Sequence, residues 1–258
     1  MKKKLIILLS ITILFLSIAM ATFYVGKNIA PTTFKTSFVE ITNEKIPDNF
    51  NAFKILYFSD LEYGKYFNKD NLDELKKSIE KLDYDIILFG GDLIDKNYSP
   101  VSDDVDILQD FLSSLTSKYG NFAILGDFDT STQSREVLVK MILDNSGFEL
   151  IEKELTIYKD KQSIILNGIN YNSDITINES DFFNIIMIHS RNQYSSLPKN
   201  TNLVLCGDTH DRQINLFFNS DYKFGLQNNL YITRGVGLTE KDYRIFNYPE
   251  LCIFILKK

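Results

Sequence analysis

The chain has 258 residues, a formal net charge of −6 and a sequence pI of about 5.1, and 44% of its residues are hydrophobic. A chain of this length can bury a well-formed core, so we expect one globular domain. The acidic balance argues against non-specific nucleic-acid binding, because such binding needs basic surface that displaces counterions from phosphates. We therefore expect no nucleic-acid partner.

The first residues predict a membrane helix. Lysines at positions 2–4 precede an uncharged, mostly apolar run from Leu5 to Val25, and a helix of that length spans about 30 Å, enough to cross a bilayer. The lysines are expected to stay in the cytoplasm, which makes the chain a single-pass membrane protein with its domain on the extracytoplasmic side. Ala19-Met20-Ala21 also fits a signal-peptide cleavage site. We favour the uncleaved signal anchor because the apolar run continues to Val25.

The rest of the chain begins as a linker and then alternates between strands and helices. We assign residues 1–26 to the anchor, 27–52 to a linker with an edge strand (Thr36–Ile46), and 53–258 to the domain. Apolar runs and helical spacing of apolar residues predict six successive elements. They are a strand at Phe53–Phe58, a helix at Asn71–Lys81, a strand at Asp85–Phe89, a helix at Val105–Ser117, a strand at Asn121–Leu125 and a helix at Gln133–Asp144. This order implies parallel strand pairing with right-handed crossovers.

The second half of the chain is dominated by short strands. The predicted strands are Phe148–Ile151, Leu155–Lys159, Gln162–Ile169, Phe183–Ile188, Asn202–Cys206, Gln213–Phe217, Asn229–Thr233 and Leu251–Leu256. We expect them to form a second, more antiparallel sheet that packs on the first, with helices outside. Cys206 and Cys252 lie in such strands, and two buried thiols are favoured over a disulfide, although one sequence leaves the pairing open.

Carboxylates and imidazoles follow five of the strands. They are Asp60 and Glu62, then Asp92, then Asp127, then His189, then Asp208 and His210, and these two histidines are the only ones in the chain. The carboxyl ends of strands in open α/β folds meet at one ligand-binding edge. Carboxylates and imidazoles are also the groups that hold Mg, Mn, Fe and Zn ions. We therefore expect one shared metal site.

The motifs that carry these residues resemble those of the calcineurin-like metallophosphoesterases, of the membrane-anchored bacterial type. The matching segments are Asp60-Leu61-Glu62, Gly91-Asp92-Leu93-Ile94-Asp95, Gly126-Asp127-Phe128-Asp129, His189 and Gly207-Asp208-Thr209-His210, in the family's order and spacing. The resemblance runs from about Phe53 to the carboxyl terminus. It implies a four-layer α/β/β/α sandwich of two mixed sheets. It also implies hydrolysis of a phosphomonoester or phosphodiester by a metal-activated hydroxide.

Carried over by position, the resemblance implies two divalent ions. One would be held by Asp60, Glu62, Asp92 and His210, and the other by Asp92, Asp127, His189 and Asp208. Glu62, Asp127 and Asp208 stand where the family has His, Asn and His, so the site is richer in oxygen than usual. Oxygen ligands favour Mn²⁺, with Mg²⁺, Fe²⁺ and Ca²⁺ as alternatives.

The catalytic machinery departs further from the family pattern. Phe128 stands at the family's catalytic His, and loss of such a proton-transfer group lowers rates by about 10²–10⁴-fold. Asp92 is the expected bridging residue, and Arg212 can compensate by pairing with phosphate, or can instead pair with Asp211. Two functions therefore remain open. The first is a phosphoesterase whose anchor places it beside lipid headgroups or cell-envelope phosphodiesters, and the second is a membrane-tethered, non-catalytic binding or scaffold protein. The enzyme ranks first because every changed ligand position still holds a metal-binding group.

Overall fold

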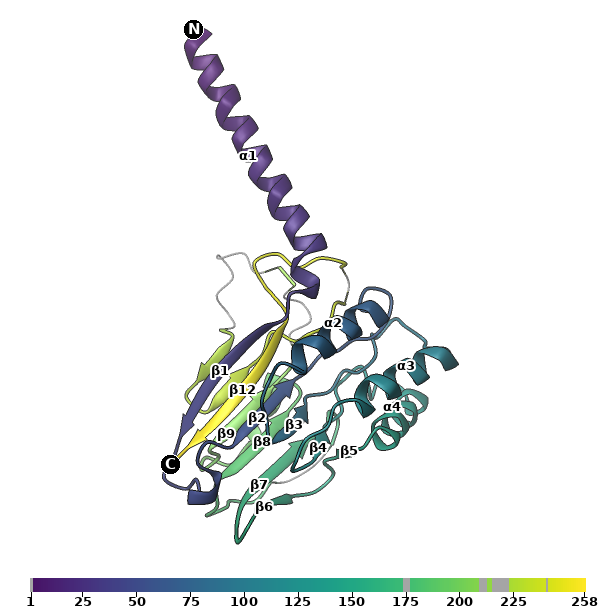
Figure 1. Cartoon of the computed structure of the whole chain (residues 1–258), viewed down its shortest axis with the longest axis vertical. Coiled ribbons are helices and arrows are strands. Elements are labelled where there is room, and N and C mark those ends of the chain that lie inside the picture. The colour runs from purple at the N-terminus through teal and green to yellow at the C-terminus, as the bar shows by residue number, and fades with distance from the viewer. Residues whose placement is uncertain (1, 174–176, 209–212, 215–222, 240) are drawn as a thin grey trace.

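A computed structural model describes residues 2–173, 177–208, 213–214, 223–239 and 241–258 of the chain. A long helix, α1 (Lys2–Asn28), projects away from a body built on two sheets (Figure 1). Among the described residues, α1 is long and apolar enough to cross a membrane, and its apolar window is not buried against the rest of the protein. An apolar helix that no core covers is suited to a lipid environment.

The first sheet contains the alternating strands and helices predicted from the sequence. Its strand order is β1-β12-β2-β3-β4-β5, with parallel pairing except between β12 and β2. The strands are β1 (Lys35–Thr42), β2 (Lys54–Phe58), β3 (Ile86–Phe89), β4 (Asn121–Ala123), β5 (Phe148–Leu150) and β12 (Glu250–Lys257). The crossovers contain α2 (Lys69–Ile79), α3 (Ser102–Ser113) and α4 (Gln133–Asn145). Asn68 and Thr132 cap the first turns of α2 and α4 with their side chains, which explains where these two helices begin.

The second sheet has the order β10-β11-β9-β8-β7-β6. Its strands are β6 (Leu155–Lys159), β7 (Gln162–Ile169), β8 (Asn184–Ile188), β9 (Leu203–Cys206), β10 (Gly225–Gln227) and β11 (Leu230–Ile232). Short 3-10 helices complete the described elements: η1 (Ala30–Thr32), η2 (Asp48–Phe50) and η3 (Arg191–Ser196).

Apolar side chains form three layers that hold the sheets and helices together. One cluster, which includes Leu75 and Ile87, lies between the first sheet and α2–α4. A second, which includes Tyr57 and Met187, fills the space between the two sheets. A third, which includes Ile186, covers the outer face of the second sheet, where Tyr194 of η3 packs against it. The expected α/β sandwich of two mixed sheets is confirmed, although in the described residues its outer layer over the second sheet is η3 rather than an α-helix.

Two strands from the second half of the chain belong to the first sheet, contrary to the prediction. β5 pairs with β4 at one edge, and β12 inserts between β1 and β2. The second sheet is antiparallel only in its outer pairs, β6·β7 and β10·β11, because parallel pairing of long apolar runs occupies its centre. The two cysteines are free, buried thiols in different sheets, as favoured from the sequence. Of the predicted strand Gln213–Phe217, residues 215–217 lie outside the described part of the chain.

Candidate metal centre

Five of the predicted ligands meet at the carboxyl ends of β2, β3, β4, β8 and β9. Ligand atoms of Asp60, Asp92 and His189 all lie within 4.8 Å of one another. Those of Asp127, His189 and Asp208 form a second set of the same size. We call these residues together the carboxylate–His189 cluster. Carboxylate oxygens and an imidazole nitrogen at this spacing fit a divalent cation.

His189 belongs to both sets, and its surroundings orient it as a ligand. The ring is fully buried, and its Nδ1–H donates to the carbonyl oxygen of Gly90 at 2.8 Å. Its Nε2 therefore faces the site, 3.2 Å from Asp92 Oδ2 and 3.2 Å from Asp127 Oδ1. A metal-ligating histidine characteristically gives its other N–H to a carbonyl or carboxylate in this way, which keeps the ring orientation constant.

The same surroundings set the charge of His189. Burial alone lowers the pKa of an imidazole, but Asp92, Asp127 and Asp60 outweigh it and raise the pKa of His189 well above its usual value. Without a cation, the imidazolium thus partly neutralises the clustered acids. A cation bound at Nε2 would replace that proton and would itself neutralise the acids.

The backbone at the site adopts an unusual conformation at four of the acids. Asp60, Glu62, Asp92 and Asp208 have positive φ angles of 56°, 52°, 58° and 55°. Residues other than glycine rarely enter this left-handed region, and they persist there where the surroundings enforce it, often at functional sites. Three of these four acids, Asp60, Asp92 and Asp208, belong to the carboxylate–His189 cluster.

Asp129 holds the turns after β3 and β4 together, and sequence reasoning did not single it out. Its fully buried carboxylate accepts hydrogen bonds from the backbone N–H groups of Asp92 at 2.7 Å, Leu93 at 2.9 Å and Gly126 at 3.0 Å. Burial raises the pKa of Asp129, and these three N–H donors act in the opposite direction. The only sequence signal for this role was its place as the last residue of the Gly126-Asp127-Phe128-Asp129 motif.

Asp60 and Asp92 are themselves positioned by hydrogen bonds. Ser59 Oγ–H donates to Asp60 Oδ2, and the backbone N–H of Asp208 donates to Asp60 Oδ1 at 3.1 Å. The backbone N–H of Phe128 donates to Asp92 Oδ1 at 3.0 Å. A Cβ at Gly126 would lie well inside van der Waals contact with that same oxygen, so only glycine leaves room for the Asp92 carboxylate.

Glu62 is buried but lies outside both ligand sets in the described residues. It lines a small pocket with Asp60, Arg234 and Arg244. Burial lowers the pKa of Arg244 to about 10, and the negative charges of Glu62 and Asp60 act against this decrease. The structure therefore places Glu62 beside a buried cation. His210 and Arg212, the other predicted ligand and the predicted phosphate-binding cation, lie outside the described residues.

Phe128, which follows Asp127 in the chain, is 8% exposed. The ammonium group of Lys96 lies over this ring, 5.4 Å from its centroid. The loop that carries Lys96 is held by Arg135, whose guanidinium donates to the carbonyl oxygens of Asp95 at 2.7 Å and Tyr98 at 2.7 Å. A cation on a supported loop thus stands over Phe128, the residue that follows Asp127 of the cluster.

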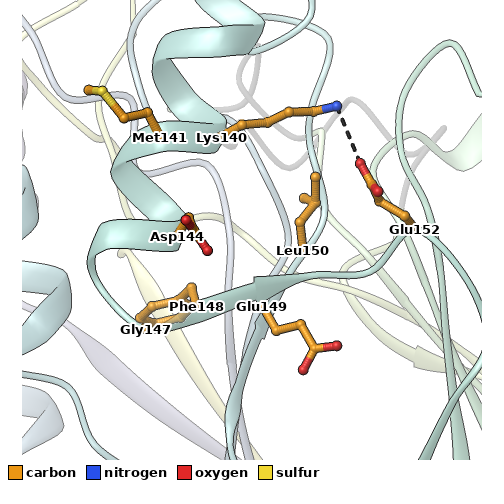
Figure 2. Close-up of a pocket in the computed structure, with 8 residues that line it drawn as sticks. All are labelled: Lys140, Met141, Asp144, Gly147, Phe148, Glu149, Leu150 and Glu152. Atoms are coloured by element: carbon orange, nitrogen blue, oxygen red, sulfur yellow. Dashed lines mark hydrogen bonds and ion pairs between the residues drawn. The ribbon is translucent and has the colours of Figure 1, made fainter.

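A separate open pocket lies between α4 and β5 (Figure 2). Its one cationic lining residue, Lys140, forms ion pairs with Glu136 at 2.9 Å and with Glu152 at 3.4 Å. The other charged groups that line this pocket are the carboxylates of Asp144, Glu149 and Glu152. The residues that line this pocket include no imidazole and none of the predicted ligands, so the carboxylate–His189 cluster is the better candidate site.

Comparison with known proteins identifies the family of the chain. Residues 53–212 match the family model described as calcineurin-like phosphoesterase. The chain is 25% identical to the uncharacterized metallophosphoesterase YkuE of Bacillus subtilis, over 90% of this chain and 88% of that protein. It is 26% identical to the uncharacterized metallophosphoesterase Cj0846 of Campylobacter jejuni, over 86% of this chain and 64% of the relative. It is also 23% identical to a zebrafish protein named transmembrane protein with metallophosphoesterase domain, over 85% of this chain and 56% of the relative.

Proposed function

Because the chain belongs to the calcineurin-like phosphoesterase family, we propose that it is a metal-dependent phosphoesterase that hydrolyses a phosphomonoester or phosphodiester. The observation that carries the proposal is the position of His189. Its Nε2 lies within 3.2 Å of two carboxylates and belongs to both ligand sets. Three separate strands thus deliver one imidazole and two acids to a single point.

The residues that would hold the metal follow from the two sets. Asp60 and Asp92 would hold one divalent ion, and Asp92, Asp127, His189 and Asp208 would hold a second, because the Nε2 of His189 has one lone pair and can bind a single ion. Mn²⁺ is the proposed cation, because the donors are mainly carboxylate oxygens. When bound, such ions act as Lewis acids and neutralise charge on a phosphoryl group. His210 remains a proposed ligand, and Arg212 a proposed phosphate contact.

The chain's own residues have distinct tasks in this scheme. Asp92 lies at the centre and is oriented by the Phe128 N–H, while Asp129 keeps its turn against that of Asp127. Phe128 excludes water but transfers no proton. The ammonium of Lys96, above the Phe128 ring, provides positive charge for a substrate phosphate.

The membrane placement is part of the proposal. The helix α1 would remain as a signal anchor, with the domain on the extracytoplasmic side because the lysines at positions 2–4 precede it. The name of the zebrafish relative supports a membrane location.

A non-catalytic scaffold is the second candidate, and two observations favour it. The catalytic His position holds a buried phenyl ring, and Glu62 lies beside Arg244 instead of in a ligand set. Such a protein would keep the fold and a structural cation while binding a partner. It would bind metal without turning over esters.

One experiment separates these readings. We would purify the full chain in detergent without chelator, measure its metal content, and assay a panel of phosphomonoesters and phosphodiesters with added Mn²⁺. The enzyme predicts bound divalent metal and turnover that Asp92→Asn abolishes. A matched control is Asp144→Asn, an exposed acid in the α4–β5 pocket, which should leave both unchanged. Metal without turnover of any ester would establish the scaffold, and absence of metal after incubation with Mn²⁺ would reject the metal site itself.

A further inference from the structure

The strand directions place the candidate metal centre at the edge of the body nearest α1. The helix leads through η1 into the amino end of β1, and β12 runs parallel to β1. β2 is antiparallel to β12, so its carboxyl end lies at that same edge, together with those of the parallel strands β3 and β4. Figure 1 shows α1 leaving the body on this side, opposite the turn between β6 and β7.

Three hydrogen bonds link the last turn of α1 to the first metal ligand. The backbone N–H of Arg244 donates to the carbonyl oxygen of Gly26 at 2.8 Å. Nη2 of the same residue donates to the carbonyl oxygen of Gly237 at 2.6 Å. The backbone N–H of Gly237 then donates to the carbonyl oxygen of Asp60 at 2.7 Å. Arg244 is 4% exposed, so this connection is internal to the body.

Side chains at the end of α1 also contact residues 242–245. The rings of Phe23 and Tyr243 have centroids 5.7 Å apart, and Lys27 forms an ion pair with Asp242 at 3.1 Å. A Cβ on Gly26 would approach the Arg244 carbonyl oxygen to 2.8 Å and Ile245 Cγ1 to 2.9 Å. The end of α1 therefore packs directly against the 242–245 loop and is not joined to the body by a flexible linker alone.

Apolar side chains are exposed at this junction. Phe246, directly after the docked loop, is 53% exposed and has a positive φ of 54°. Ile29, in the turn after α1, is 44% exposed. Aromatic and aliphatic side chains beside the end of a membrane helix suit the headgroup region of a bilayer.

We propose that the substrate is a phosphate ester carried by a membrane lipid, presented to the carboxylate–His189 cluster from the leaflet that α1 enters. The chemistry of this inference rests on the proposed function. The orientation of the site toward the membrane is independent of that function. In the reaction, the oxygen of a water molecule forms a bond to phosphorus, the bond between phosphorus and the ester oxygen breaks, and the departing alcohol takes up a proton. The lipid needs no extraction from the bilayer, because the site lies at the membrane-facing edge.

The orientation is tested without any activity. The chain has no tryptophan, so Phe246→Trp and Tyr158→Trp each introduce a single fluorophore into the full chain. Tyr158 is 68% exposed in the strand before the β6–β7 turn, at the far edge of the second sheet. In phosphatidylcholine vesicles with brominated acyl chains, the tryptophan at 246 should be quenched and that at 158 should not. Equal quenching at both sites, or none at 246, would overturn the proposal.

The substrate class is tested with matched pairs in the same vesicles. Phosphatidic acid and phosphatidylglycerol are compared with their soluble headgroups, glycerophosphate and glycerophosphoglycerol, using the reconstituted full chain with Mn²⁺. We expect turnover of a lipid form to exceed that of its soluble counterpart at least about tenfold, because co-localisation raises the effective concentration. Turnover of the soluble esters alone would overturn the lipid substrate and leave the phosphoesterase standing. If none of these esters is hydrolysed but the tryptophan at 246 is quenched, the proposed phosphoesterase activity and the lipid substrate both fail. The orientation of the domain at the membrane would still stand.

A variant at the junction between α1 and the 242–245 loop tests whether lipid turnover and quenching at 246 change together. Gly26→Leu wedges the helix away from the 242–245 loop, while Ala19→Leu adds the same side chain to an exposed position of α1. Gly26→Leu should lower lipid turnover about tenfold and weaken quenching at 246, with Ala19→Leu unchanged. Equal lipid turnover in both variants would contradict a role for the docked helix.

Discussion

The carboxylate of Asp129 accepts a hydrogen bond of 2.7 Å from the backbone N–H of Asp92, although the two residues belong to different turns. With the bonds from Leu93 and Gly126, this places one buried acid behind the metal-facing carboxylates. The geometry of the cluster therefore depends on a residue that would touch no metal.

Asp129→Asn is the first prediction. An amide keeps the size of the carboxylate but has one acceptor oxygen and no charge, so the three N–H donors lose part of their bonding. We expect a loss of about 1–3 kcal/mol in the free energy of unfolding and a metal affinity about 10–100-fold weaker. Chemical denaturation and Mn²⁺ titration of the purified chain measure the two effects. Unchanged metal affinity would show that the two turns keep their places without Asp129.

Alanine substitutions of two glycines at the site should weaken Mn²⁺ binding to different extents. In Gly126→Ala the new methyl group would overlap Asp92 Oδ1, whereas in Gly207→Ala its nearest atom is the Ser59 hydroxyl oxygen, at 2.9 Å. A hydroxyl can rotate away, but the Asp92 carboxylate cannot move without leaving the cluster. We expect Gly126→Ala to abolish Mn²⁺ binding, as followed by the metal-dependent increase in Tm, and Gly207→Ala to retain most of it. The reverse order would contradict the central position of Asp92.

Lys96 provides a prediction about phosphate binding. Lys96→Met retains a long apolar side chain over the Phe128 ring but removes the charge, and should raise KM for a phosphate ester about tenfold or more by loss of a charged hydrogen bond. The control is Lys118→Met, since Lys118 lies 5.0 Å from the centroid of Tyr119 at the opposite end of the strands. Lys96→Arg should restore binding. If Lys96→Met and Lys118→Met gave the same KM, Lys96 would have no part in the site.

Phe128→His probes the missing proton-transfer group. An imidazole at this position should raise kcat, by up to about 10²-fold, and should introduce a pH dependence into kcat that the parent chain lacks. Phe128→Leu, which restores no such group, is the control. A rise in kcat for both variants would indicate that the phenyl ring merely obstructs the site.

Asp104 provides a prediction about pH and stability. Burial raises the pKa of Asp104, but hydrogen bonds from Val101 N–H, Tyr98 and Tyr63 outweigh this and leave the pKa below its usual value. A lowered folded-state pKa contributes stability above the unfolded pKa, and this contribution disappears as the pH falls through the folded value. Asp104→Asn should thus be about 1–3 kcal/mol less stable than the parent near neutral pH, and the difference should shrink below about pH 4. Urea unfolding at several pH values measures it, and a constant difference would refute the assignment.

The parts of the fold that the sequence predicted are those with strong local patterns. Ile55–Phe58 and Ile86–Phe89 are continuous apolar runs because helices cover one face of their sheet and the second sheet covers the other. The residues that meet in the carboxylate–His189 cluster could be predicted because they follow such runs directly. By contrast, the surroundings of Glu62 depend on Arg244, which comes from the other end of the chain. No local pattern reports that contact, and Asp129 was overlooked because its partners are backbone N–H groups.

The insertion of β12 between β1 and β2 has a consequence for how the chain folds during synthesis. β1 directly follows α1 and is made early, yet the strand that pairs with it, Glu250–Lys257, is synthesised much later. Until that segment has been synthesised, β1 and β2 each present an open edge, and closing the sheet requires contacts between the two ends of the chain, which form slowly. The nascent domain therefore has an incomplete first sheet until Glu250–Lys257 has been made, and a chain truncated before Glu250 lacks the strand that joins β1 to β2.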